Sequence, residues 1–164
     1  MATANKNLSN YDKNTMPNAS QMRFGIVVSE WNEEITEGLF NGAYETLIDL
    51  GVLPENIVRE NVPGSFELPF GAKLILDNDH VDAVIAIGVV IQGETKHFDF
   101  VCHGVTQGIV ELNHQYASPT IFCVLTDMNI EQSRARSGGE HGNKGVEAAV
   151  AAVKMADLCK RKAR

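Results

Sequence analysis

The hydrophobic pattern from Arg23 onward alternates between two periods. Four short, nearly continuous apolar runs are typical of buried strands, at residues 24–28, 56–62, 81–91 and 120–125. Apolar residues at helical spacing predict helices between and after them, at residues 32–50, 68–76, 96–116, 129–138 and 143–160. Strands that are apolar on both faces and separated by helices form parallel sheets covered on both sides. The pattern therefore predicts an α/β fold, a three-layer α/β/α domain with a four-stranded parallel sheet.

The first 22 residues differ from the rest, because Asn, Ser, Thr and Lys predominate and apolar residues are scattered. Such a segment buries too little apolar surface to offset the entropy that it loses on ordering. We therefore expect residues 1–22 to be a flexible polar tail, followed by a single domain at residues 23–164. The alternative is a segment that becomes ordered only against a neighbouring subunit.

Composition and charge exclude several classes of protein. The chain has 164 residues, enough for one ordinary domain, and is 44% hydrophobic with a formal net charge of −7. An acidic chain lacks the diffuse positive field that non-specific nucleic-acid binding needs. No stretch approaches the roughly 18 uninterrupted apolar residues of a membrane span. We expect neither nucleic acid nor a membrane as a partner.

The three cysteines, Cys102, Cys123 and Cys159, are far apart and form no CxxC pair or zinc spacing. They are typical of small buried residues in a reduced compartment. The start of the chain has no basic segment followed by an apolar one, so a cytoplasmic location is expected. The dinucleotide and P-loop glycine motifs are missing as well. We expect no metal and no cofactor.

Candidate binding residues follow the strands, where parallel sheets bind ligands. Trp31 follows the first strand and offers a flat face for stacking a heterocycle, unless it is a core aromatic. Ser65, Phe66 and Glu67 open the next helix, where a hydroxyl, a ring and a carboxylate can meet the polar edges of a ligand. The alternative for this turn is a plain helix cap.

His97 falls in the first turn of the helix after the third strand, behind Gly93 and Thr95. The positive end of a helix disfavours an imidazolium, so a neutral ring there can act as a general base or proton shuttle. A capping or packing histidine is the alternative. A metal pair with Asp99 is weaker, because helical spacing points the two side chains apart.

Arg136 and Lys144 flank a glycine-rich link between the last two helices, the first of which opens with the capping box of Asn129 and Gln132. Glycines allow close backbone approach, and a helix N-terminus with Arg and Lys nearby is a small-anion site. The alternative is a tight connection with surface cations.

Three motifs, at residues 62–69, 88–99 and 142–149, together resemble the 6,7-dimethyl-8-ribityllumazine synthase family, and the resemblance covers about residues 23–158. It implies a flavodoxin-like sheet. It also implies an enzyme that condenses 5-amino-6-(ribitylamino)pyrimidinedione with 3,4-dihydroxy-2-butanone 4-phosphate, releasing phosphate and water in riboflavin biosynthesis. Two alternatives are a binding protein that only holds a flavin or lumazine, and a related enzyme that joins two lumazines. Neither needs a phosphate site.

By resemblance, Trp31 stacks on the pyrimidine, and the pocket for the pyrimidine and its ribityl chain is formed by Ser65, Phe66, Glu67 and the backbone of Val89, Val90 and Ile91. On the side of the phosphate substrate, the resemblance implies Glu94 and Thr95 at the ketone phosphate, His97 in proton transfer, Arg136 on the phosphate and Lys144 near it.

The resemblance also implies an oligomer, because Phe122 matches an aromatic that the family supplies from the adjacent subunit. Members form pentamers, and in some of them twelve pentamers close into a shell of sixty subunits. Members that stop at the pentamer tend to carry inserted residues in the link between the last two helices, and residues 136–144 show none. We therefore expect a homo-oligomer of sixty chains, with riboflavin synthase as a further candidate partner.

Overall fold

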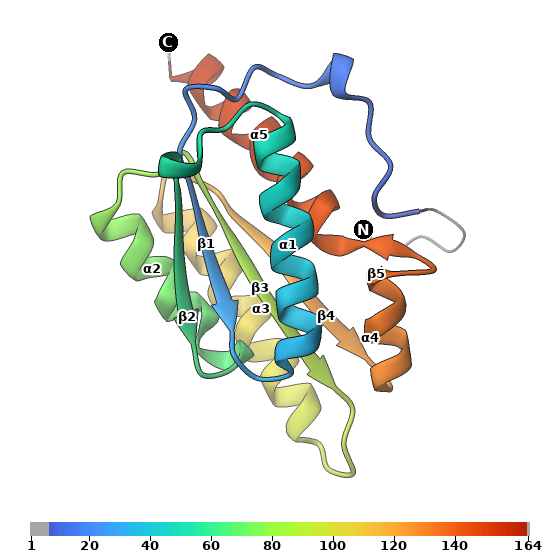
Figure 1. Cartoon of the computed structure of the whole chain (residues 1–164). Helices are drawn as coiled ribbons and strands as arrows, with labels where there is room; N and C mark the ends of the chain where they lie inside the picture. Colours follow the sequence, from blue (N-terminus) through green and yellow to red (C-terminus); the bar gives the residue numbers. More distant parts are fainter. Residues whose placement is uncertain (1–6, 164) are drawn as a thin grey trace.

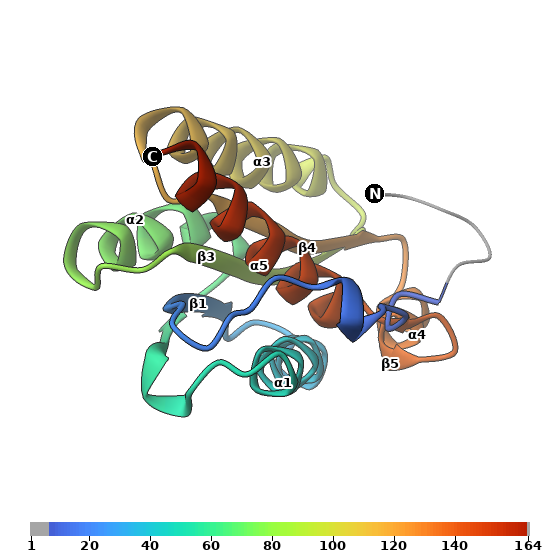
Figure 2. The same ribbon diagram turned by 90° about the horizontal axis from the view of Figure 1, so that it is seen from above.

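The parallel sheet of the computed structural model, which describes residues 7–163, has the strand order β2-β1-β3-β4. Its strands are β1 (Phe24–Ser29), β2 (Ile57–Val62), β3 (Ala83–Ile91) and β4 (Thr120–Asp127), all parallel to their neighbours. The helices that cover it are α1 (Glu33–Asp49), α2 (Leu68–Asn78), α3 (His97–Gln115) and α5 (Lys144–Lys162). Three layers are visible in Figures 1 and 2. The predicted three-layer α/β/α fold with a flavodoxin-like sheet is confirmed.

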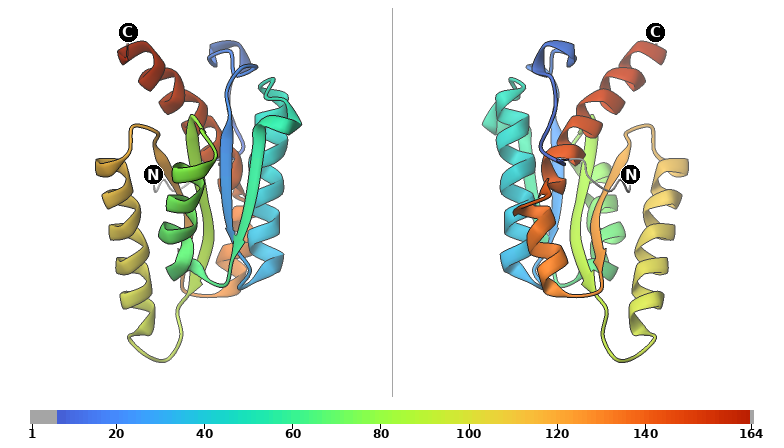
Figure 3. Two further views of the ribbon diagram at one scale, coloured as in Figure 1. Left: turned by 90° about the vertical axis from the view of Figure 1, so that its left-hand side faces the viewer. Right: turned by 90° about the vertical axis from the view of Figure 1, so that its right-hand side faces the viewer.

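Two apolar cores fill the space between the layers, one on each face of the sheet. The larger lies under α1 and α5 and includes Leu39, Leu47 and Ile85, and the smaller lies under α2 and α3 and includes Leu68 and Val105. Figure 3 shows the two helix layers from both sides. Burial on both faces explains why β1 and β3 are almost continuously apolar.

The glycine-rich link between the last two helices contains regular structure that the sequence analysis did not predict. Helix α4 (Ile130–Arg136) ends earlier than predicted, and a short antiparallel hairpin follows, β5 (Ser137–Gly139) and β6 (Gly142–Asn143). Gly138 and Gly142 have φ values of 125° and 83°, which side chains rarely tolerate. The Asn143 side chain then caps α5 by accepting a hydrogen bond from the Gly145 amide at 2.8 Å.

The N-terminal segment also differs from expectation, because residues 7–22 lie against their own subunit. The Leu8 amide donates to the His141 carbonyl oxygen, and the Asn143 amide donates to Ser9 Oγ, both at 2.9 Å. The segment therefore hydrogen-bonds the β5–β6 hairpin, beside which it lies in Figure 1. Residues 1–6 of the predicted tail lie outside the described residues.

Further along, this segment is tied to the end of α1. Asp49 accepts hydrogen bonds from the Tyr11 hydroxyl at 2.7 Å and the Lys13 ammonium at 2.8 Å, beside a short 3-10 turn, η1 (Lys13–Thr15). Ala19 and Met22 are buried in the larger core. Scattered apolar residues are enough here because each enters a core that the domain has already built.

Candidate active site

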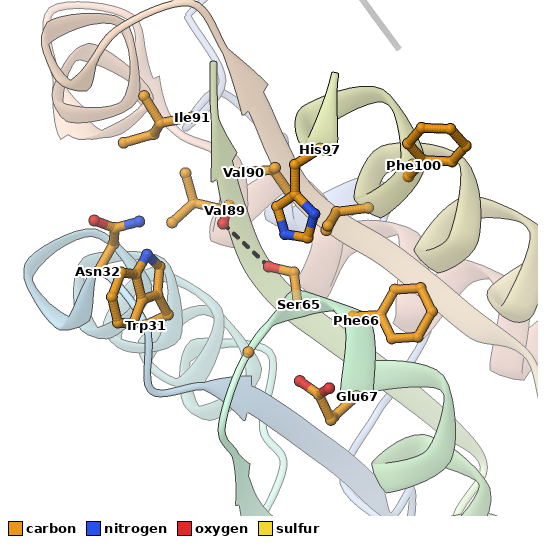
Figure 4. A pocket seen from close by; sticks show the side chains of 12 residues that line it. Trp31, Asn32, Ser65, Phe66, Glu67, Val89, Val90, Ile91, His97 and Phe100 are labelled. Carbon is orange, nitrogen blue, oxygen red and sulfur yellow. Dashed lines mark hydrogen bonds between the residues drawn. The ribbon is translucent and has the colours of Figure 1, made fainter. Parts of the chain in front are cut away.

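A cavity of about 690 Å³ opens at the carboxyl ends of β1, β2 and β3. It is lined by Trp31, Asn32, Gly64, Ser65, Phe66, Glu67, Val89, Val90, Ile91, His97, Phe100 and Val101. Figure 4 shows these side chains around the opening. All the residues predicted for the pyrimidine side, together with His97, are brought together here by the ends of three strands.

Trp31 forms one wall of the cavity, in the turn between β1 and α1. Its side chain is 71% exposed, which excludes the alternative of a core aromatic. The next residue, Asn32, has a left-handed backbone with a φ of 61°, a conformation that asparagine tolerates better than most residues. That turn leaves the indole beside the opening, where a flat ring can stack on it (Figure 4).

The turn after β2 forms the floor, in the 3-10 turn η3 (Ser65–Glu67). Ser65 is buried, and its hydroxyl donates to the Val89 carbonyl oxygen at 3.1 Å. The hydroxyl therefore faces β3 rather than capping the helix that follows, so the plain-cap alternative does not describe it. Glu67 and the exposed Phe66 ring complete this side.

The backbone of β3 adds polar groups to the cavity. Its register with β1 ends at the pair Val28 and Ile87, whereas β3 itself continues to Ile91. Beyond that pair, the edge of β3 that faces β1 extends past the neighbouring strand. Amide and carbonyl groups along such an edge can bind a ligand with hydrogen-bonding edges of its own.

His97 begins α3 and lies across the opening from Trp31, with the end of β3 between them (Figure 4). The Thr95 hydroxyl oxygen accepts a long hydrogen bond, 3.4 Å, from the His97 amide, which marks the start of the helix. Glu94 and Thr95 are exposed and do not line the cavity. Among the described residues, no cluster of three or more His, Cys, Asp or Glu side chains forms that can hold a metal ion.

Three predicted residues lie elsewhere on the chain. Phe122 is part of the edge strand β4 and is 37% exposed. Arg136 ends α4, and its guanidinium donates to the Gln132 carbonyl oxygen at 2.9 Å. Lys144 begins α5 and forms an ion pair with Glu147 at 2.6 Å. None of the three lines the cavity, so a single chain does not bring all the predicted site residues together.

The sequence analysis missed four lining residues, Asn32, Gly64, Phe100 and Val101. The sequence does contain a signal for two of them, because Phe100 and Val101 follow His97 by three and four positions and therefore share its helix face. Asn32 was read as part of a helix, whereas the helix begins one residue later. In the described part of the chain, no helix is long and apolar enough to cross a membrane.

Comparisons with known proteins agree with the geometry. The family model of 6,7-dimethyl-8-ribityllumazine synthase matches residues 21–160. A protein of that name from Christiangramia forsetii is 70% identical over 161 residues, which cover 98% of this chain and 96% of the relative. One from Flavobacterium johnsoniae is 70% identical over 156 residues, 95% of this chain and 82% of the relative. One from Porphyromonas gingivalis is 52% identical over 158 residues, 96% and 98% of the two chains.

Proposed function

Because the chain belongs to the 6,7-dimethyl-8-ribityllumazine synthase family, we propose that it condenses 5-amino-6-(ribitylamino)pyrimidinedione with 3,4-dihydroxy-2-butanone 4-phosphate. The enzyme is a transferase of riboflavin biosynthesis that forms a lumazine. The observation that carries the choice of substrates is the cavity in which Trp31 and His97 lie on opposite sides of the end of β3. Its volume of about 690 Å³ and its mixture of aromatic and polar groups suit a heterocycle with a polyol chain.

In the proposed reaction, the pyrimidine amine attacks the ketone carbon, and an imine forms as one water leaves. Removal of a proton from the next carbon breaks the C–O bond to phosphate, and the resulting enol becomes a ketone. The ribitylamine nitrogen then closes the ring onto that ketone, and a second water leaves. His97 moves protons in these steps, while stacking on Trp31 and hydrogen bonds to β3 hold the pyrimidine. Holding two reactants together can contribute several kcal/mol.

The phosphate group of the butanone substrate needs cations, which a second copy of the chain supplies in the proposed site. Among the described residues that line the cavity, none is Lys or Arg, yet a leaving phosphate dianion needs a cation. Arg136 and Lys144 are the predicted cations, and both lie outside the cavity, as does Phe122. We place these three residues opposite the cavity of a neighbouring subunit.

Exposed aromatic rings around the opening support this arrangement. Phe100 is 71% exposed and Phe66 is 58% exposed, although both line the cavity. Large exposed apolar patches mark surfaces that another molecule covers. A neighbouring copy that brings Phe122 to this opening covers these rings and completes the site.

For the assembly, we propose the sixty-subunit shell. The link from α4 to α5 consists of the short β5–β6 hairpin. It has no inserted residues that would turn α4 away from a fivefold axis. Light scattering on the purified protein tests this proposal. A mass near 1 MDa, about sixty chains, supports the shell, and a mass near 90 kDa, about five chains, contradicts it.

Complementation between two impaired variants tests the shared site. We expect His97→Ala and Arg136→Ala chains, each impaired alone, to regain activity when they are co-expressed in equal amounts. Random assembly leaves about one interface in four with both halves intact. Lumazine fluorescence and phosphate release are measured together. Activity that stays at the level of the separate variants means that His97 and Arg136 act in one chain.

A further inference from the structure

Arg136 is carried by a short helix that depends on contacts with the rest of the domain. Helix α4 has seven residues, and isolated helices shorter than about 12 residues are marginal in water. Its N-terminal end has an exposed capping box: Asn129 Oδ1 accepts from the Gln132 amide, and Gln132 Oε1 accepts from the Met128 amide. These hydrogen bonds stabilise the helix itself. They do not fix it against the sheet.

One buried contact does join α4 to the sheet. Ser133 is the helix residue that is fully buried, and its hydroxyl donates to Asp127 Oδ2 at 2.7 Å. Asp127 is the last residue of β4, and 8% of its surface is exposed. A hydrogen bond to a buried carboxylate is stronger than one between neutral groups, and its loss leaves a costly unpartnered acceptor.

The same carboxylate residue is connected to the cavity strand. Asp127 is in register with Ile91 of β3, and its carbonyl oxygen accepts from the Gln92 amide at 2.9 Å. Ser133 precedes Arg136 by three residues, so the two side chains share one face of the helix. The Ser133–Asp127 hydrogen bond therefore links the helix that carries the guanidinium to the end of the sheet, beside the packing of Ile130 on the larger core and the ion pair of Arg134 with Glu34.

We infer that Asp127 and Ser133 are positioning residues for Arg136 and, through it, determine how tightly the enzyme binds its phosphate substrate. This inference rests on the proposed function, in which Arg136 binds the phosphate. Neither residue touches substrate. Their effect is on the phosphate side alone, because the residues that bind the pyrimidine lie on other elements.

Steady-state kinetics on four variants test the inference. Ser133→Ala raises KM for the butanone phosphate about tenfold, a loss of about 1.4 kcal/mol, and leaves KM for the pyrimidine within twofold. Inhibition by inorganic phosphate weakens by a similar factor. Asp127→Asn keeps an oxygen that accepts the Ser133 hydrogen bond, so it stays near the wild type. Arg134→Ala is the matched control, because it removes an exposed ion pair with Glu34 from the same helix.

Arg136→Ala separates the two ways to fail. If it raises KM for the butanone phosphate and Ser133→Ala does not, the positioning role is overturned and the proposed function stands. If Arg136→Ala leaves that KM unchanged, the phosphate assignment itself is wrong. Equal rises of both KM values in Ser133→Ala, or the same effect from Arg134→Ala, indicate a general loss of structure and also overturn the inference. Should Ser133→Ala be unstable, a fifth variant, Asp127→Ala, removes the same hydrogen bond from the strand side and is expected to raise KM for the butanone phosphate alone; no rise overturns the inference.

Discussion

The Ser65 hydroxyl donates a hydrogen bond to the carbonyl oxygen of Val89, and this one contact joins the turn after β2 to the end of β3. Both residues line the cavity. Their separation fixes the width of the floor on which the pyrimidine is proposed to lie. The buried Ser65 hydroxyl therefore acts as a spacer that holds the turn after β2 and the end of β3 at a fixed distance.

Loss of that spacer should weaken pyrimidine binding. A typical hydrogen bond contributes about 0.5–1.5 kcal/mol, so we expect Ser65→Ala to raise KM for the pyrimidine about three- to tenfold. Ser118→Ala is the matched control, because the Ser118 hydroxyl donates to the Val81 carbonyl oxygen near the opposite end of β3. Both variants should lose similar stability in denaturant titrations. An unchanged pyrimidine KM in Ser65→Ala contradicts the spacer role.

Replacement of His97 should slow the enzyme without silencing it. General acid–base groups typically contribute about 10²–10⁴-fold, and we expect a loss near 10²-fold in kcat for His97→Ala because positioning of the reactants remains. His103→Ala is the control on the same helix, exposed and outside the cavity. A completely inactive but correctly folded His97→Ala protein would count against a mechanism that depends mainly on proximity.

The stability that the domain gains from attachment of the N-terminal segment should fall at low pH. Hydrogen bonds from Lys13 and then Tyr11 hold the pKa of Asp49 below its ordinary value. A lowered pKa in the folded state gives a stabilisation that is complete above the unfolded pKa of about 3.9 and is lost as pH falls through the folded value. The difference in Tm between the wild type and Asp49→Asn should therefore be constant from pH 7 to about 5 and shrink below pH 4.

That comparison is made at one protein concentration, because assembly also changes Tm. Glu45→Gln, an exposed carboxylate on the same helix, is the control. If the difference for Asp49→Asn is independent of pH, the contact with Lys13 and Tyr11 is not formed in solution.

Gly145 should tolerate no side chain. A Cβ there lies far inside van der Waals contact of the Leu39 carbonyl oxygen, in the backbone of α1. Overpacking costs about 1–3 kcal/mol or more, and backbone cannot move aside as a side chain does, so Gly145→Ala should lower Tm by about 10 °C. Gly93→Ala is the control, since a Cβ there meets nothing within 4 Å. A Tm within 2 °C of the wild type corresponds to a loss of only about 0.5 kcal/mol. That result would mean that α1 and α5 are packed less closely than in this structure.

The strands and the cavity could be read from the sequence because both follow from local pattern. The apolar runs of β1 and β3 gave their positions, and the rule that ligands bind at strand ends brought Trp31, Ser65 and His97 into one group. Strand β4 continues to Asp127, past its predicted end, because its last residues pair with Val90 and Ile91. Pairing between strands is not visible in the periodicity of either one.

Other features depend on contacts that no local pattern encodes. The β5–β6 hairpin requires positive φ at Gly138 and Gly142. A cluster of glycines in a sequence indicates conformational freedom but does not show which backbone conformation is adopted. The attachment of residues 7–22 was missed because polar composition predicts solvation, whereas Tyr11 and Lys13 find one carboxylate at Asp49. The proposed role of Phe122 requires a second chain and cannot be seen in one.

The attachment of the N-terminal segment has a consequence for synthesis. Ser9 is joined to Asn143 across 134 positions of sequence, and Leu8 to His141. These first residues emerge from the ribosome early, but their partners are translated near the end of the message. Leu8 and Ser9 therefore stay without these partners until almost the whole polypeptide has been made, whereas Tyr11 and Lys13 can meet Asp49 much earlier. Within this segment, the residues that are translated earlier are therefore the last to find their hydrogen-bond partners.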